Sequence, residues 1–317
     1  MSSRVDVHTH LIPPFYAEAL KSHGGDPSGW GSPEWSPEQA IRFMNGEEIA
    51  VSVLSLTAPG IDGWPVGEER TGIARRVNDY GADLVQKRPD RFGYFATLPL
   101  PDVDAALQEI ERAYDRLKVD GIVLHSNYGG IYLADPSFEQ VWEELNRRSA
   151  VVFVHPTTPH LVKVLPGIPG PIEDYPAETT RSALNLVIAG FLNRFSSTKI
   201  VLSHGGGFLP YAATRFAELK SSLDSGSTVE ELTATMKSFY FDTALCAPSG
   251  FPSLLAFATP GHVVFGSDYP YASESVSKVF TRNMDQYNQF KTGELDQINL
   301  GARTLFPRLL KMQGRAA

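Results

Sequence analysis

The segment Val5-Asp6-Val7-His8-Thr9-His10 is a short β-branched run that ends in two histidines separated by one residue. Side chains alternate in direction along an extended backbone, so His8 and His10 point to the same face of the predicted strand. Two imidazoles that converge at a strand end can hold a divalent metal ion. Such a pair alone fits a disordered terminal segment equally well, so its interpretation depends on what ends the other strands.

Seven further short apolar runs follow, separated by segments with helical features, and the eight predicted strands centre near residues 5, 51, 94, 122, 152, 200, 240 and 264. Runs rich in Val and Ile are typical of parallel strands buried on both faces. Eight strands that alternate with helices predict an α/β fold, the (β/α)8 or TIM barrel, with an open doubly wound sheet as the alternative. The 317 residues fit one barrel, and no repeat or linker divides them, so residues 1–317 are expected to form a single domain.

Two loops of the predicted barrel are long and rich in Pro and Gly. The first, residues 11–37, follows the first strand and contains Trp30, Trp35 and a short predicted helix around residues 15–22. The second, residues 165–176, follows the fifth strand. Long loops in compact domains are often functional, so both are predicted to fold over the rim of the barrel as lids.

The composition limits the partners and the location of the protein. The formal net charge is −8 and no basic run occurs, which argues against binding to nucleic acid. The single cysteine, Cys246, excludes an intrachain disulfide and fits a reducing compartment. No apolar run reaches the roughly 18 residues of a membrane span, and no leader-like segment precedes the first strand. We therefore expect a cytoplasmic protein without a membrane partner.

The ends of strands one, five, six and eight carry histidines and an aspartate, at the rim where TIM-barrel enzymes have their catalytic groups. Strands one, five, six and eight end in His8, His10, His155, His204 and Asp268. Each residue alone has a structural explanation, such as a turn for His155 or a helix cap for Asp268. Together they predict a metal site, and neutral imidazoles with one carboxylate suit Zn²⁺, with Mn²⁺ as the alternative.

This arrangement of histidines and aspartate resembles the amidohydrolase superfamily. The fourth strand ends in Leu124-His125-Ser126, without the lysine that forms the carbamate bridge of the two-metal members, so the resemblance implies a single metal. Four further motifs are similar to the aminocarboxymuconate-semialdehyde decarboxylase family: Asp90-Arg91-Phe92-Gly93, Tyr175-Pro176-Ala177-Glu178-Thr179-Thr180, Ser203-His204-Gly205-Gly206-Gly207 and Gly266-Ser267-Asp268-Tyr269-Pro270.

The resemblance implies a metal-dependent, non-oxidative decarboxylase of small aromatic or unsaturated carboxylic acids that needs no organic cofactor. Carried over by position, it implies one divalent metal with four ligands: His8, His10, His155 and Asp268. His204 would stand beside the metal, and either His204 or Asp268 would deliver a proton to carbon. The resemblance also implies a homodimer in which Arg215 reaches the site of the partner subunit.

The first long loop departs from that family. It contains no arginine, although the family uses one there for a second carboxylate, and Trp30 and Trp35 occupy the region instead. Burying a second carboxylate without a cation would be costly. We therefore expect a substrate with one carboxylate and an apolar ring, a salicylate-type acid such as 6-methylsalicylate. The alternatives are aminocarboxymuconate semialdehyde, or a lactone or amide that the same metal would hydrolyse.

Five residues are candidates for substrate contacts: Arg215, Trp30, Trp35, Glu178 and His125. For Glu178, a favourable charge near a helix N-terminus explains the residue equally well. For His125, a structural hydrogen bond is an equal alternative. Asp242 ends the seventh strand and is a candidate hydrogen-bond partner for a metal ligand.

Overall fold

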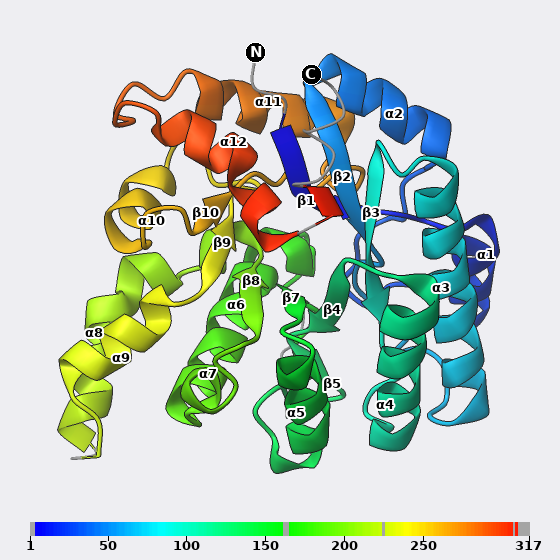
Figure 1. The fold of residues 1–317 in the computed structure, drawn as a ribbon, viewed down its shortest axis with the longest axis horizontal. Coiled ribbons are helices and arrows are strands. Elements are labelled where there is room, and N and C mark those ends of the chain that lie inside the picture. Colours follow the sequence, from blue (N-terminus) through cyan, green and yellow to red (C-terminus); the bar gives the residue numbers. More distant parts are fainter. Residues whose placement is uncertain (1–3, 161–164, 224–225, 307, 310–317) are drawn as a thin grey trace.

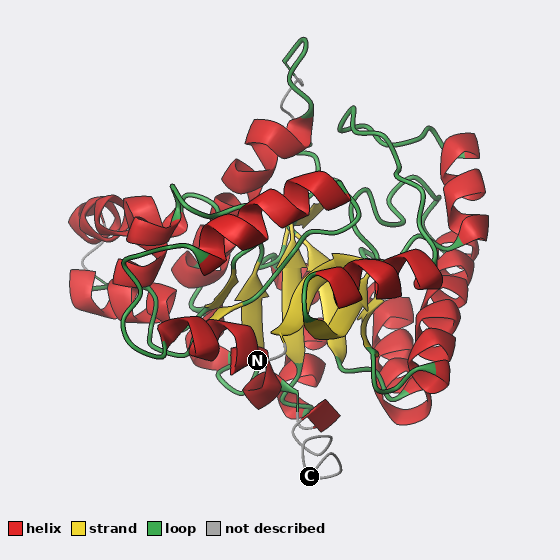
Figure 2. Cartoon of the chain, turned by 90° about the horizontal axis from the view of Figure 1, so that it is seen from above, coloured by secondary structure: helices red, strands yellow, loops and turns green. Residues whose placement is uncertain are grey.

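Eight parallel strands form a barrel at the centre of the molecule. A computed structural model describes residues 4–160, 165–223, 226–306 and 308–309. Figure 2 shows the strands surrounded by helices. The strands neighbour one another in chain order: β1 (Arg4–His10), β2 (Ile49–Ser55), β3 (Phe92–Thr97), β4 (Gly121–His125), β7 (Val151–His155), β8 (Lys199–Leu202), β9 (Tyr240–Asp242) and β10 (Val263–Val264). All eight predicted strands are present, so the predicted (β/α)8 barrel is confirmed.

The barrel closes where β1 meets the segment that begins with β10. Val7 N donates to Phe265 O at 3.0 Å, and Asp268 N donates to His8 O at 2.7 Å. These bonds bring the first strand and the segment after the last strand side by side. Because side chains of both elements face the same rim, the closing seam also juxtaposes His8 and Asp268.

The helices cover the outside of the strands (Figure 1). Their bounds are α1 (Pro14–Ser22), α2 (Pro37–Gly46), α3 (Glu68–Lys87), α4 (Val103–Arg112), α5 (Glu139–Arg147), α6 (Gly170–Ile188), α7 (Phe191–Arg194), α8 (Leu209–Leu223), α9 (Val229–Lys237), α10 (Phe251–Phe257), α11 (Glu274–Asp285) and α12 (Glu294–Leu305). A short antiparallel pair, β5 (Asn127–Tyr128) and β6 (Ile131–Tyr132), follows β4. Asp102 caps α4 by accepting a hydrogen bond from Ala105 N at 3.0 Å. No helix in the described part of the chain is both long and apolar enough to cross a bilayer.

Apolar side chains from the strands fill the barrel beneath the rim. This cluster includes Val7, Val53, Phe95 and Phe153, and residues of α12 and its continuation pack against it. The ring centroid of Phe153 lies 5.0 Å from that of His8. The histidines at the rim therefore pack against buried apolar side chains, which exclude water on the side that faces the barrel interior.

The two predicted lids contact each other, but the second is shorter than the sequence predicts. Gly170 N donates to Ser28 O at 2.9 Å, which joins the lids. The second lid was expected to extend to Pro176, whereas α6 already begins at Gly170. Pro171 lies in the first turn of this helix, where the missing N–H of proline is tolerated, so the Pro-rich composition indicates a helix start there.

Candidate metal centre and active site

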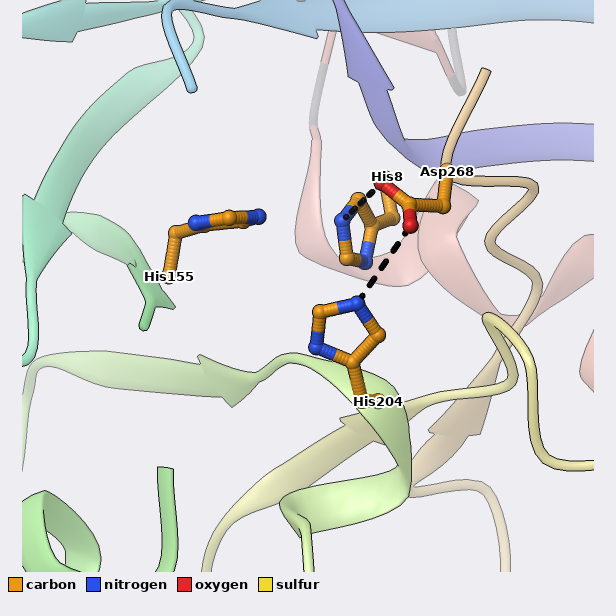
Figure 3. A group of neighbouring side chains, drawn as sticks. All are labelled: His8, His155, His204 and Asp268. Carbon is orange, nitrogen blue, oxygen red and sulfur yellow. Dashed lines mark hydrogen bonds and ion pairs between the residues drawn. The ribbon is translucent and has the colours of Figure 1, made fainter. Parts of the chain in front are cut away.

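Four side chains from separate strand ends converge at the rim of the barrel. His8 comes from β1 and His155 from β7, whereas His204 lies two residues after the end of β8 and Asp268 four residues after the end of β10. Each offers one ligand atom, and these atoms all lie within 4.8 Å of one another (Figure 3). Three imidazole nitrogens and a carboxylate oxygen at this spacing form a donor set suited to a divalent transition metal.

Asp268 contacts two other members of this group, His8 and His204, and it also contacts His10 of β1. Its Oδ1 lies 3.1 Å from His8 Nε2 and 3.2 Å from His10 Nε2. Its Oδ2 lies 3.5 Å from His204 Nε2. The structure therefore brings together all five residues that the strand ends predict. His10 falls outside the group of four and His204 inside it, although the resemblance places them the other way round.

Hydrogen bonds fix the outer nitrogen of three histidines. Nδ1 lies 2.6 Å from Asp242 Oδ2 in His8, 3.0 Å from Ser55 Oγ in His10, and 2.8 Å from the backbone oxygen of Pro156 in His155. A proton on Nδ1 of His8 or His155 satisfies these acceptors and leaves Nε2 with a lone pair that points to the centre. This is the arrangement by which proteins orient metal-binding histidines.

The charges and the free nitrogens at the centre fit a divalent cation. Burial would lower the pKa of His8, but the charges of Asp242 and Asp268 outweigh it and raise that pKa to about 10. Burial, together with the neighbouring imidazoles, holds the pKa of His155 well below its usual value. His8 Nε2 is also buried and lies 3.1 Å from Asp268 Oδ1. The two buried carboxylates, Asp242 and Asp268, thus favour positive charge at the centre, which a divalent cation can supply in place of the proton on His8.

The backbone is strained at two of these residues. His204 has φ 51° and Asp268 has φ 60°, both in the left-handed region that favours glycine. Such conformations cost roughly 1–3 kcal/mol at a non-glycine residue and persist where the surroundings impose them. Here they turn both side chains back over the barrel, toward the other members of the group.

The group opens into a cavity of about 710 Å³. His155, His204 and Asp268 lie on its wall, and Trp30 of the first lid lies there too. Among the described residues that line it, none is a lysine or an arginine. A bound acid would therefore find positive charge only at the metal and at its histidines.

Comparison with known proteins agrees with this geometry, because a family model described as amidohydrolase matches residues 5–307. The chain belongs to the amidohydrolase family. It is 42% identical to decarboxylase macB of Penicillium terrestre, covering 96% of this chain and 95% of the relative. It is 39% identical to a 6-methylsalicylic acid decarboxylase of Penicillium expansum, covering 97% of both chains.

A solved structure shares the fold of this amidohydrolase. The 5-carboxyvanillate decarboxylase of Novosphingobium aromaticivorans, complexed with manganese and 4-hydroxy-3-methoxy-5-nitrobenzoic acid, matches with a TM-score of 0.84. The match covers 96% of each chain at 22% sequence identity. At that identity the likeness establishes the barrel architecture.

The substrate contacts expected in this amidohydrolase divide into those on the cavity wall and those elsewhere. Trp30 lines the cavity, and its Nε1 donates to the backbone oxygen of Tyr271 at 3.3 Å. Trp35 instead packs in the hydrophobic core near Tyr80, with 9% of its surface exposed. The lid turns inward before α2 and buries the indole away from the cavity, so the expected substrate contact of Trp35 stays a prediction.

Glu178 links α6 to the short β5–β6 pair. Its buried carboxylate accepts hydrogen bonds from Asn127 Nδ2 at 3.0 Å and Tyr132 OH at 2.8 Å, and it pairs with Arg181 at 2.6 Å. It thereby ties α6 to the β5–β6 pair and does not line the cavity. These contacts give Glu178 a structural role, and its expected contact with substrate stays a prediction.

His125 and Arg215 also lie off the cavity wall. His125 is buried, and burial lowers its pKa to about 4, so its imidazole is neutral near pH 7. Gly60 covers it closely, since a Cβ atom on Gly60 would lie 2.0 Å from His125 Cε1. Arg215 is exposed on α8 and does not line the cavity of its own chain. Its expected role across a subunit interface stays a prediction.

Sequence reasoning missed several polar residues of the cavity, among them Tyr271 and Asp26. Tyr271 lies on its wall, with its ring centroid 5.7 Å from that of His10. Its position three residues after Asp268 was a usable signal, because residues that follow a catalytic strand end commonly face the same site. Asp26 of the first lid also lines the cavity, and no strand end marks it.

Proposed function

We propose that this amidohydrolase is a metal-dependent, non-oxidative decarboxylase of a salicylate-type acid, 6-methylsalicylate or a related hydroxybenzoate. One observation carries the proposal: the His/Asp group opens on a cavity whose described lining contains no lysine or arginine. A single carboxylate can be neutralised at the metal end, whereas a second one would find no cation on the described wall that this chain supplies. The names of the two fungal relatives support the same reaction and the same substrate class.

We propose that His8, His10, His155 and Asp268 hold one divalent metal, with Zn²⁺ as the first choice and Mn²⁺ as the alternative. The fixed Nδ1 atoms of the three histidines support this set. The group of four leaves His204 as an alternative fourth ligand. The metal, when bound, supplies a Lewis acid that orients the carboxylate and the neighbouring phenolate of the substrate.

His204 is the proposed proton donor. It lines the cavity, and its Nδ1 has no hydrogen-bond partner in the described structure, whereas His8, His10 and His155 are anchored there. A proton passes from Nε2 of His204 to the ring carbon that bears the carboxylate. The bond between that carbon and the carboxylate then breaks, its electron pair restores the aromatic ring, and CO2 leaves. His204 regains its proton from water.

The test uses purified protein loaded with Zn²⁺ or Mn²⁺ and measures CO2 release from 6-methylsalicylate, salicylate and dihydroxybenzoates. The proposal expects CO2 and the corresponding phenol in equal amounts. Hydrolysis of aryl lactones without CO2 release from any of these acids would favour the hydrolase alternative. A His204→Asn variant is expected to keep its metal and lose turnover by about 10²–10⁴-fold. A His155→Ala variant is expected to lose the metal as well.

A homodimer is proposed from the surface of α8 beside the cavity mouth. Tyr211, on the cavity wall, is 82% exposed, Leu223 at the far end of α8 is 86% exposed, and Arg215 lies one turn after Tyr211. Exposed apolar side chains along one helix mark an interaction surface. Light scattering tests the dimer, and restored activity in a mixture of Arg215→Ala and His155→Ala chains tests a shared site. The cytoplasmic location and the single domain stay predictions from the sequence.

A further inference from the structure

Asp26 is a carboxylate on the cavity wall that the proposed reaction does not use. It lines the same cavity as His204 and Asp268. Ser28 N donates to its Oδ1 at 2.8 Å, and Ser28 is its only hydrogen-bond donor within the described chain. No cationic side chain of the described residues pairs with it. The cavity therefore contains an acceptor whose charge the protein leaves uncompensated.

The first lid holds Asp26 firmly in this position. Gly170 N donates to Ser28 O at 2.9 Å, which attaches the segment to α6. Trp30 N donates to Ser28 Oγ at 3.2 Å, and Trp30 Nε1 donates to the backbone oxygen of Tyr271 at 3.3 Å. The backbone beside Asp26 is thus attached from two sides, and Ser28 N holds the carboxylate itself. A group held in this way can discriminate between ligands, because it cannot move away from an unsuitable one.

The hydroxyl of Tyr271 feels the charges of both Asp26 and Asp268. Burial raises the pKa of Tyr271, and the charges of Asp26 and then of Asp268 raise it further. Both carboxylates are therefore within electrostatic reach of the same phenol. The hydroxyl of the neighbouring Tyr16 donates to Gly60 O at 2.6 Å, so it does not satisfy Asp26. Asp26, Tyr271 and Asp268 all lie on the wall of the cavity in which a substrate would bind.

We propose that Asp26 is a specificity-determining residue that accepts a hydrogen bond from a ring hydroxyl of the substrate and excludes a second carboxylate. The inference rests on the proposed function and extends it to hydroxylated salicylates, which carry a hydroxyl besides the one next to the carboxylate. An ionised carboxylate can only accept hydrogen bonds, so it favours a phenol there. It repels an anionic group at the same place.

The experiment compares two variants with the wild-type protein loaded with metal. Salicylate, its 2,4-, 2,5- and 2,6-dihydroxy analogues and 5-carboxysalicylate serve as probes. For each, kcat/KM is measured by CO2 release and Kd by calorimetry. Asp26→Ala removes acceptor and charge, whereas Asp26→Asn removes the charge and keeps a carbonyl oxygen. Glu34→Gln is the matched control, because Glu34 is an exposed carboxylate of the same lid that does not line the cavity.

The wild type is expected to prefer one dihydroxybenzoate to salicylate by about tenfold or more, a preference that Asp26→Ala abolishes. Asp26→Asn should keep part of this preference and bind 5-carboxysalicylate about tenfold more tightly than the wild type does. Equal losses for all acids, or ratios that match the Glu34→Gln control, would overturn the inference. If no acid is decarboxylated, the proposed function fails, while the ratios of Kd values still test Asp26.

Discussion

Asp242 Oδ2 lies 2.6 Å from His8 Nδ1, and both side chains are completely buried. Asp242 ends β9 and His8 belongs to β1, so the contact crosses the barrel interior near the seam. The carboxylate determines which nitrogen of His8 carries the proton. It therefore controls whether the other nitrogen offers a lone pair to a metal.

The Asp242→Asn variant tests whether Asp242 determines which nitrogen of His8 carries the proton. An amide oxygen accepts the Nδ1 proton less strongly, and an amide nitrogen facing His8 would favour the wrong tautomer. We expect the metal affinity to fall by about 10–100-fold, with a parallel loss of decarboxylation. Competition with a chromophoric chelator measures the affinity. Asp104→Asn, at an exposed position of α4, is the control, and equal affinities in both variants would contradict the role of Asp242.

Metal removal is expected to abolish activity and lower stability. A ligand that binds only the folded state stabilises it by about 2.7 kcal/mol when its free concentration is a hundred times Kd. Dialysis against a chelator should therefore lower Tm by several degrees, and Zn²⁺ or Mn²⁺ should restore both Tm and CO2 release. An unchanged Tm and full activity in protein that elemental analysis shows to be metal-free would exclude a metal-dependent reaction.

The contact of Gly60 with His125 predicts a costly substitution. Gly60 has φ +60°, and an added Cβ would lie 2.0 Å from His125 Cε1. Gly60→Ala combines a left-handed backbone with overpacking, and the overpacking alone costs about 1–3 kcal/mol. Gly24→Ala is the matched control, because Gly24 has φ +96° and open space around its Cα. Urea unfolding should show the difference in free energy of unfolding between the two variants. Equal losses of stability would mean that the His125 side chain moves aside without a measurable cost.

Glu178→Gln separates a structural role from a role in substrate binding. The carboxylate accepts hydrogen bonds from Ser126, Asn127 and Tyr132, so an amide nitrogen would face donors in place of an acceptor. We expect the free energy of unfolding to fall by about 1–3 kcal/mol. The KM of the folded variant for salicylate-type acids should stay within about threefold of the wild-type value.

Glu173→Gln, on an exposed position of the same helix, is the control for this change. It should alter neither the free energy of unfolding nor KM. A Glu178→Gln protein with wild-type stability and a strongly raised KM would show that Glu178 contributes to substrate binding.

The strand ends could be predicted from the sequence because they depend on local patterns. A short apolar run is recognisable alone, and the parallel order of a barrel brings the residues that follow such runs to one rim. His155 and Asp268 were therefore found without knowledge of distances. The confirmed barrel comes from the same local signals.

The lids could not be predicted in this way, because their side chains are placed by tertiary contacts. Trp30 and Trp35 look alike in the sequence, yet one lines the cavity and the other is buried near Tyr80. Glu178 is surrounded by donors from a pair of short strands that no local pattern links to it. Composition indicates that a loop matters, but it does not tell which face each residue presents.

The seam between β1 and the segment after β10 has a consequence for when the protein acquires its metal. A ribosome makes the histidines of β1 well before it makes Asp268. The hydrogen bond from Asp268 N to His8 O forms once both segments are in place. The proposed ligand set is therefore complete only after the seam has formed, so a bound metal would mark the molecules whose barrel has closed.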